Sequence, residues 1–120
     1  MSRVLIVDDE EYVREPLKEI LRAQGHEVMA AKNGIEATDC FNMNGFDLTI
    51  IDIIMPGKAG VQLIRECLSL NPKIRIVAMT GSIYSEEYLK TARDFGAHAV
   101  LSKPFSDESI KAAIKDALAA

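Results

Sequence analysis

Five short apolar runs recur along the chain, and polar residues are nearly absent within them. These runs are residues 4–7, 28–31, 48–51, 74–79 and 99–101. Continuous apolar runs of this length are typical of strands that are buried on both faces of a parallel sheet. Their starts lie about 20–26 residues apart, which leaves room for one helix between successive strands.

The segments between and after these runs have helical spacing or helix-end signals. Apolar residues form stripes over residues 13–21, 37–41, 63–68 and 110–118. Ser85 followed by two acids predicts a helix start, Gly96 predicts its end, and Ser106 opens the last helix. Pro16 conflicts with the first stripe, because proline removes a helical hydrogen bond unless the helix starts late or kinks there.

Fivefold alternation of strand and helix predicts right-handed crossovers and a parallel sheet with helices on both faces. This is a doubly wound α/β architecture, and residues 1–120 suffice for one such domain, without a separate output domain. Domains of this class place their sites beyond the carboxyl ends of the strands, near the point where the strand order reverses.

The composition narrows the function classes. The chain has 14 Lys and Arg against 18 Asp and Glu, a net charge of −4, and it is 48% hydrophobic. This apolar content argues against disorder, and the charge provides no clustered basic face for direct nucleic-acid binding. No apolar run is long enough for a membrane span, and the N-terminus lacks a signal-peptide profile, so we expect a cytoplasmic protein. Cys40 and Cys67 lack disulfide-framework or metal-ligand spacing.

Four of the five predicted strands end in polar residues. Asp8 and Asp9 follow the first run, Asp52 the third, Thr80 the fourth and Lys103 the fifth. The three aspartates converge if the first and third strands are neighbours. Carboxylates at close range repel one another unless a cation is present, and hard oxygen ligands suit Mg²⁺. Together with an ammonium and a hydroxyl, this set is typical of a phosphoryl-transfer site.

Four motifs carry a resemblance that extends over the whole chain. They are VLIVDDE, DLTIIDIIMPGKAG, IVAMTG and LSKPF, in this order. The sequence resembles the response-regulator receiver domains of two-component signalling, a superfamily that includes chemotaxis regulators. The resemblance implies a flavodoxin-like (βα)5 sandwich with a five-stranded parallel sheet of order 2-1-3-4-5. It also implies a signalling protein that catalyses only its own phosphorylation and dephosphorylation.

The resemblance implies a role for each matching acidic position. Asp52 would be the phosphoacceptor, which attacks a phosphohistidine on a partner protein to form an acyl phosphate. Asp9, Asp52 and the backbone carbonyl of Ile54 would bind Mg²⁺, and Asp8 would act mainly through a bound water.

Further roles follow from the same resemblance for the remaining strand ends and loops. Thr80 would donate a hydrogen bond to the phosphoryl group, and Lys103 would pair with it. The bond between Lys103 and Pro104 would be cis, as is usual in the family. Residues 55–57 and Gly60 would shape the loop beside the acceptor.

Two departures from the family pattern affect the expected behaviour. Val100 stands where many receivers carry an aromatic residue, so the usual threonine–aromatic switch is in doubt, and activation would act through loop and helix repositioning. Ile54 and Ser82 occupy the two positions that flank the hydrolytic water in the family. Because Ile54 offers no hydrogen bond to that water, we expect slow self-hydrolysis of the acyl phosphate.

The resemblance implies a histidine kinase or a histidine phosphotransferase as the phosphodonor, and a target protein or output domain downstream. Phosphorylation-dependent dimerisation is a further expectation. Alternatives within the family are a relay intermediate that passes phosphate to a histidine phosphotransferase, and the receiver part of a longer DNA-binding or enzymatic regulator. A flavodoxin-type module is disfavoured because the acids of residues 8–10 would repel its phosphate, and a P-loop motif is absent.

Overall fold

Five parallel strands form one sheet that carries helices on both faces. The computed structural model describes residues 2–43, 45–54, 60–81 and 85–120. The elements are β1 (Arg3–Val7), α1 (Glu11–Ala23), β2 (Glu27–Ala31), α2 (Gly34–Met43), β3 (Leu48–Asp52), α3 (Gly60–Leu70), β4 (Arg75–Thr80), α4 (Ser85–Phe95), β5 (Ala99–Ser102) and α5 (Asp107–Ala119). The strand order is β2-β1-β3-β4-β5, and every pairing is parallel. This confirms the predicted doubly wound fold.

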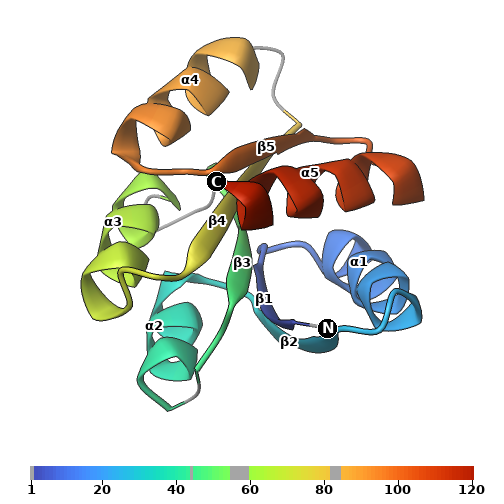
Figure 1. Ribbon diagram of the computed structural model, residues 1–120, viewed down its shortest axis with the longest axis horizontal. Helices are drawn as coiled ribbons and strands as arrows, with labels where there is room; N and C mark the ends of the chain where they lie inside the picture. Colours follow the sequence, from blue (N-terminus) through green and yellow to red (C-terminus); the bar gives the residue numbers. More distant parts are fainter. Residues whose placement is uncertain (1, 44, 55–59, 82–84) are drawn as a thin grey trace.

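The helices are divided between the two faces of the sheet, with α1 and α5 on one side and α2, α3 and α4 on the other (Figure 1). Strand β1 shows why its run is continuously apolar. Val4 and Ile6 join the core cluster under α1 and α5, whereas Leu5 and Val7 join the cluster under the other three helices. Successive side chains of a strand point to opposite faces, so a central strand needs apolar residues at every position.

Strand β2 departs from the prediction that all five strands are buried on both faces. It lies at one edge of the sheet, where β1 is its partner. Glu27 and Met29 are exposed, Met29 by 40%, whereas Ala31 is buried. The prediction was wrong here because an edge strand is covered on fewer sides than a central one.

Helix α1 begins at Glu11, well before Pro16, so the proline does not mark a late start. Val13, Leu17 and Leu21 are buried on the sheet, while Pro16 lies on the exposed side. The packing of this apolar stripe therefore outweighs the low helix propensity of proline.

The predicted helix ends agree with the structure. Helix α4 begins at Ser85, and Gly96 follows its end with a φ of 121°, a left-handed value that favours glycine. Ser106 caps α5, since its side chain accepts a hydrogen bond from the backbone N–H of Ser109 and the Ser109 hydroxyl reciprocates. These caps fix where α5 starts after the polar end of β5.

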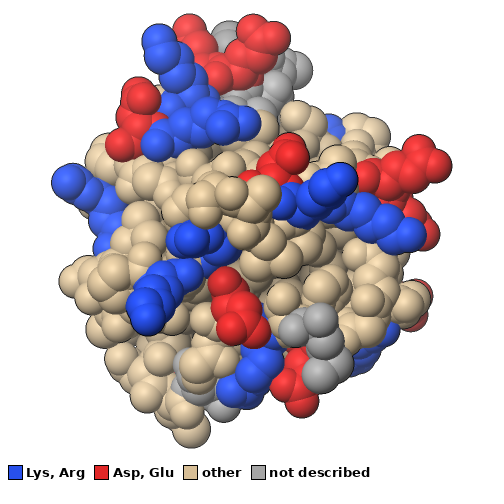
Figure 2. All heavy atoms as spheres, in the orientation of Figure 1, with Lys and Arg blue, Asp and Glu red and all other residues tan. Residues whose placement is uncertain are grey.

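Two expectations from the sequence can be compared with the surface and helices of the structure: no membrane-spanning segment and no clustered basic face. Of the helices within the described residues, none combines the length and apolar character needed to cross a bilayer. On the face seen in Figure 2, the described basic and acidic side chains are interspersed and do not gather into one basic field. That distribution agrees with the expectation that nucleic acid is not a direct partner, which stays a prediction.

Candidate functional site

The polar residues at the strand ends meet at one edge of the sheet. Asp52 ends β3, Thr80 ends β4, and Asp8 and Lys103 directly follow β1 and β5. Because β1, β3, β4 and β5 are successive neighbours in the sheet, their carboxyl ends are adjacent. The structure thus brings together Asp8, Asp52 and Lys103 as the sequence predicted.

Lys103 joins the two buried carboxylates. Its Nζ lies 2.7 Å from Oδ2 of Asp8 and 3.1 Å from Oδ2 of Asp52. Asp8 is fully buried, Asp52 is 4% exposed, and the Lys103 side chain is 17% exposed. Two carboxylates and one ammonium leave this group with a negative charge, and buried charges require partners of this kind.

The carboxylate of Asp52 is held on both oxygens. The backbone N–H of Ile54 donates to Oδ1 at 2.9 Å, and Lys103 donates to Oδ2. The pKa of Asp52 is raised from 3.8 to about 6, chiefly by burial and also by the neighbouring charge of Asp8. The Ile54 N–H and the Lys103 ammonium partly oppose this rise. Asp52 is therefore largely ionised at pH 7.5, as a nucleophile requires.

Lys103 is stabilised in its charged form. Burial alone would lower its pKa, but the hydrogen bond to Asp8 and the charge of Asp52 outweigh burial, so its pKa is raised. Its backbone N–H donates to the Thr80 carbonyl at 2.9 Å, and its aliphatic stem packs beside Gly81. The ammonium is thus fixed at the centre of the site.

An acidic cluster lies beside this group, in the turn after β1. One ligand atom from each of Asp8, Asp9 and Glu10 lies within 4.8 Å of the others. The turn is tight because the Glu10 N–H donates to Oδ1 of Asp8 at 2.9 Å. Three carboxylates at this spacing are hard oxygen donors that fit a divalent cation such as Mg²⁺. Sequence reasoning assigned no role to Glu10, although it was visible as a third consecutive acid.

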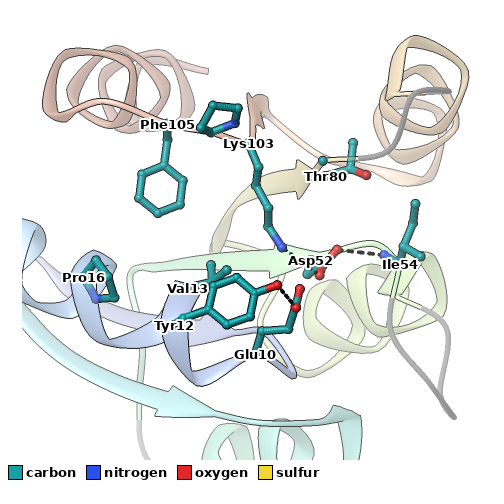
Figure 3. Close-up of a pocket in the computed structure, with 11 residues that line it drawn as sticks. Glu10, Tyr12, Val13, Pro16, Asp52, Ile54, Thr80, Lys103 and Phe105 are labelled. Carbon is teal, nitrogen blue, oxygen red and sulfur yellow. Dashed lines mark hydrogen bonds and ion pairs between the residues drawn. The ribbon is translucent and has the colours of Figure 1, made fainter.

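A pocket of about 690 Å³ opens over these groups (Figure 3). Its lining residues are Glu10, Tyr12, Val13, Pro16, Asp52, Ile54, Thr80, Gly81, Lys103, Pro104 and Phe105. The charged residues lie on one side, and Val13, Pro16 and Phe105 form an apolar wall on the other. Tyr12, which is 73% exposed, donates a hydrogen bond to the Glu10 carboxylate at the rim. Sequence reasoning gave Tyr12 and Phe105 no place in the site, although Phe105 is the last residue of the LSKPF motif.

The remaining predicted positions differ in how they relate to the pocket. Thr80 is buried and lines it, and Ile54 lines it with 44% of its surface exposed. The Lys103–Pro104 bond is cis, as expected. Val100 is half-buried on β5 and packs against the core cluster under α2, α3 and α4. Ser82 and residues 55–57 lie outside the described residues.

The sequence and the fold were compared with those of known proteins, and both match members of one family. The model of the response regulator receiver domain family matches residues 4–115. The chain is 36% identical to the chemotaxis protein CheY of Halobacterium salinarum, over 99% of this chain and 98% of that protein. It is 30% identical to sporulation initiation phosphotransferase F of Bacillus subtilis, over 95% and 91%. The solved structure of Vibrio cholerae CheY4 is similar with a TM-score of 0.88 at 28% identity, over 98% of both chains.

Proposed function

Because this chain belongs to the response regulator receiver domain family, we propose that Asp52 accepts a phosphoryl group from a phosphohistidine. Receiver domains are signalling proteins that interact with histidine kinases and output domains, and they generally bind Mg²⁺ through acidic residues. The observation that carries the proposal is the buried, ionisable Asp52 carboxylate at 3.1 Å from the Lys103 ammonium, at the floor of an open pocket.

In the proposed step, a carboxylate oxygen of Asp52 attacks phosphorus, and the bond from phosphorus to the donor imidazole nitrogen breaks. The imidazole leaves with the bonding electron pair and takes up a proton, and Asp52 becomes an acyl phosphate. Hydrolysis returns Asp52 to its unphosphorylated form, because water attacks phosphorus and releases inorganic phosphate and the free carboxylate. The chain contributes positioning and charge stabilisation, which dominate phosphoryl-transfer catalysis.

Individual residues support this step in different ways. The Ile54 N–H holds Oδ1 of Asp52, which fixes the plane of the attacking carboxylate. Lys103 supplies a positive charge beside Oδ2, where charge accumulates as the phosphoryl group arrives. Thr80 lies in the same pocket, and its hydroxyl would donate a hydrogen bond to a phosphoryl oxygen.

We assign the metal site to Asp8, Asp9 and Asp52 with the backbone carbonyl of Ile54. Glu10 is a further candidate, because its carboxylate belongs to the cluster with Asp8 and Asp9. A bound Mg²⁺ would neutralise charge on the carboxylates and on the phosphoryl oxygens. Asp9 is exposed, as suits a ligand that faces a cation from solvent.

The proposal is tested by incubation with acetyl phosphate and Mg²⁺, followed by intact-mass measurement. We expect the parent chain to gain the mass of one HPO₃ group, and Asp52→Asn to gain none. Asp39→Asn, which alters an exposed aspartate on α2, is the matched control and should react like the parent. A parent chain that gains no phosphate under conditions in which a reference receiver does would refute the proposal.

A relay intermediate is a second candidate function. It is favoured by the similarity over nearly the full length to a protein named a phosphotransferase. Phosphate that leaves Asp52 for an added histidine phosphotransferase would support the relay. A phosphorylation-dependent complex that retains the phosphate would instead support a regulator that acts by binding its target. Dimerisation and a cytoplasmic location stay predictions.

A further inference from the structure

Arg14 reaches from helix α1 to the turn that carries the acidic cluster. Its Nη1 donates a hydrogen bond to the backbone carbonyl of Asp8 at 2.9 Å, and the side chain is half-buried. The arginine lies neither in the acceptor group nor in the pocket lining. Its contact is nevertheless directed at the backbone immediately before Asp9, so it bears on how the acidic side chains are presented.

Asp8 is held by contacts from four directions. Its N–H donates to the Ala31 carbonyl at 3.2 Å, and its own carbonyl accepts from Arg14. Its carboxylate accepts from the Glu10 N–H at 2.9 Å and pairs with Lys103 at 2.7 Å. Since the peptide group is planar, fixing the Asp8 carbonyl also fixes the N–H and the Cα position of the next residue. The Arg14 bond therefore fixes the peptide plane from which the exposed Asp9 side chain departs.

The hydrogen bond from Arg14 to the Asp8 carbonyl is suited to holding the backbone of this turn in place. Arg14 uses a backbone carbonyl as its acceptor, and this contact occupies none of the carboxylate oxygens of Asp8, Asp9 and Glu10. Arginine presents several donors in a rigid planar fork, so it holds a carbonyl more firmly than a flexible ammonium does. A lysine at position 14 would keep the charge and lose much of this directional restraint.

We propose that Arg14 is a positioning residue for the divalent-cation site. By holding the Asp8 carbonyl, it orients the Asp8–Asp9 peptide and so brings the carboxylates of the cluster into the arrangement that binds the cation. This inference rests on the proposed function, because it assumes that the cluster binds Mg²⁺. Partners that orient metal ligands in this way typically change metal affinity by about 10–100-fold when they are removed.

If Arg14 acted through its charge alone, its removal would change the Mg²⁺ affinity in the opposite direction. Arg14 places a positive charge next to three carboxylates, and this charge repels a divalent cation. If electrostatics dominated, removal of Arg14 would tighten Mg²⁺ binding. If positioning dominates, removal weakens binding, so the direction of the change separates the two effects.

The experiment measures Mg²⁺ binding by isothermal titration calorimetry for the parent, Arg14→Met, Arg14→Lys and Arg22→Ala. Arg14→Met keeps the apolar stem and removes the donors, and we expect an Mg²⁺ Kd about tenfold higher than that of the parent. Arg14→Lys should show a smaller increase, about threefold. Arg22→Ala removes an exposed cation from the last turn of the same helix and should bind Mg²⁺ within about twofold of the parent.

A second readout separates positioning from a general loss of structure. The rate of phosphorylation by acetyl phosphate is measured against Mg²⁺ concentration. For Arg14→Met, the Mg²⁺ concentration at half-maximal rate should rise about tenfold, while the rate at saturating Mg²⁺ stays near that of the parent. Circular dichroism checks that each variant is folded.

The outcomes distinguish the inference from the proposed function. A parent chain that binds no Mg²⁺ contradicts the proposed metal site and this inference with it. A parent that binds Mg²⁺, together with Arg14→Met binding equally or more tightly, overturns the role of Arg14 alone. Should Arg14→Met fail to fold, an Arg14→Lys affinity equal to or tighter than that of the parent also overturns it.

Discussion

Replacement of Asp52 by asparagine should stabilise the metal-free protein. The Asp52 carboxylate is 4% exposed, and burial raises its pKa from 3.8 to about 6. The Ile54 N–H and the Lys103 ammonium therefore do not fully offset the cost of burying this charge. Asparagine has nearly the same shape, and its side-chain oxygen can still accept the Ile54 hydrogen bond. Lys103 keeps its closer partner, Asp8, at 2.7 Å.

The magnitude follows from the two pKa values. A difference of one pKa unit corresponds to about 1.4 kcal/mol, so a rise from 3.8 to about 6 destabilises the ionised protein by up to about 3 kcal/mol. Asparagine also weakens the hydrogen bond from Lys103, which offsets part of the gain. We therefore expect Asp52→Asn to raise the free energy of unfolding by about 1–3 kcal/mol at pH 7.5.

The pH dependence has a defined sign. Because the folded-state pKa is the higher one, the folded protein retains a proton that the unfolded chain releases between pH 3.8 and about 6. The penalty for ionised Asp52 is absent below this window, grows through it and is complete above it. The advantage of Asp52→Asn should thus be about half as large at pH 5 as at pH 7.5.

Urea unfolding followed by circular dichroism, in buffer with EDTA, measures these free energies. Asp39→Asn provides the control for loss of an exposed carboxylate and should change stability by less than about 0.5 kcal/mol. Addition of Mg²⁺ should stabilise the parent more than Asp52→Asn, since a ligand stabilises the state that binds it. An Asp52→Asn protein no more stable than the parent at pH 7.5, or with an equal gain at pH 5, would refute the reasoning.

Three further predictions address the neighbouring structure. Gly60→Ala should lower the free energy of unfolding by about 1–3 kcal/mol in urea titrations, because its Cβ would overlap the backbone of Ile53. Gly45→Ala, with nothing within 4 Å of its Cβ, should be nearly neutral. Ile54→Asn should shorten the lifetime of the acyl phosphate, followed by intact mass, because an amide can orient the attacking water; an unchanged lifetime would contradict the expected role of this position. Burial, and secondarily Arg75, lowers the pKa of His98, whose Nδ1 accepts the Ile76 N–H at 3.0 Å. Stability should therefore fall as pH drops below about 6.5, and urea titrations of His98→Asn should show a weaker fall.

The hydrophobic pattern predicted the strands and helices correctly, and it failed where burial depends on distant neighbours. The runs at residues 4–7 and 28–31 look alike in the sequence, yet the first forms central β1 and the second forms edge strand β2. Strand order is set by long-range packing, which local composition does not encode. Pro16 shows the same limit, because the burial of Leu17 and Leu21 keeps α1 continuous through a residue that disfavours helix.

The site was predictable to the extent that it follows from topology. Asp8, Asp52 and Lys103 meet because parallel strands deliver their carboxyl ends to one edge. The proposed role of Arg14 depends instead on the conformation of the turn after β1 and on the reach of one long side chain. In the sequence, neither its spacing nor its residue type distinguishes it from Arg22, the exposed arginine of the same helix.

The arrangement of Lys103 also bears on how phosphorylation at Asp52, the proposed acceptor, would reach the rest of the molecule. Val100 offers no aromatic side chain to reorient, whereas Lys103 contacts Asp52 directly and its backbone is bonded to the Thr80 carbonyl. Two residues later, Phe105 packs against the core cluster shared by α1 and α5. A phosphoryl group on Asp52 would therefore act first on the loop between β5 and α5, which Lys103 joins to the end of β4 by a hydrogen bond. The start of α5 is thus linked to Asp52 through Lys103 and through the packing of Phe105.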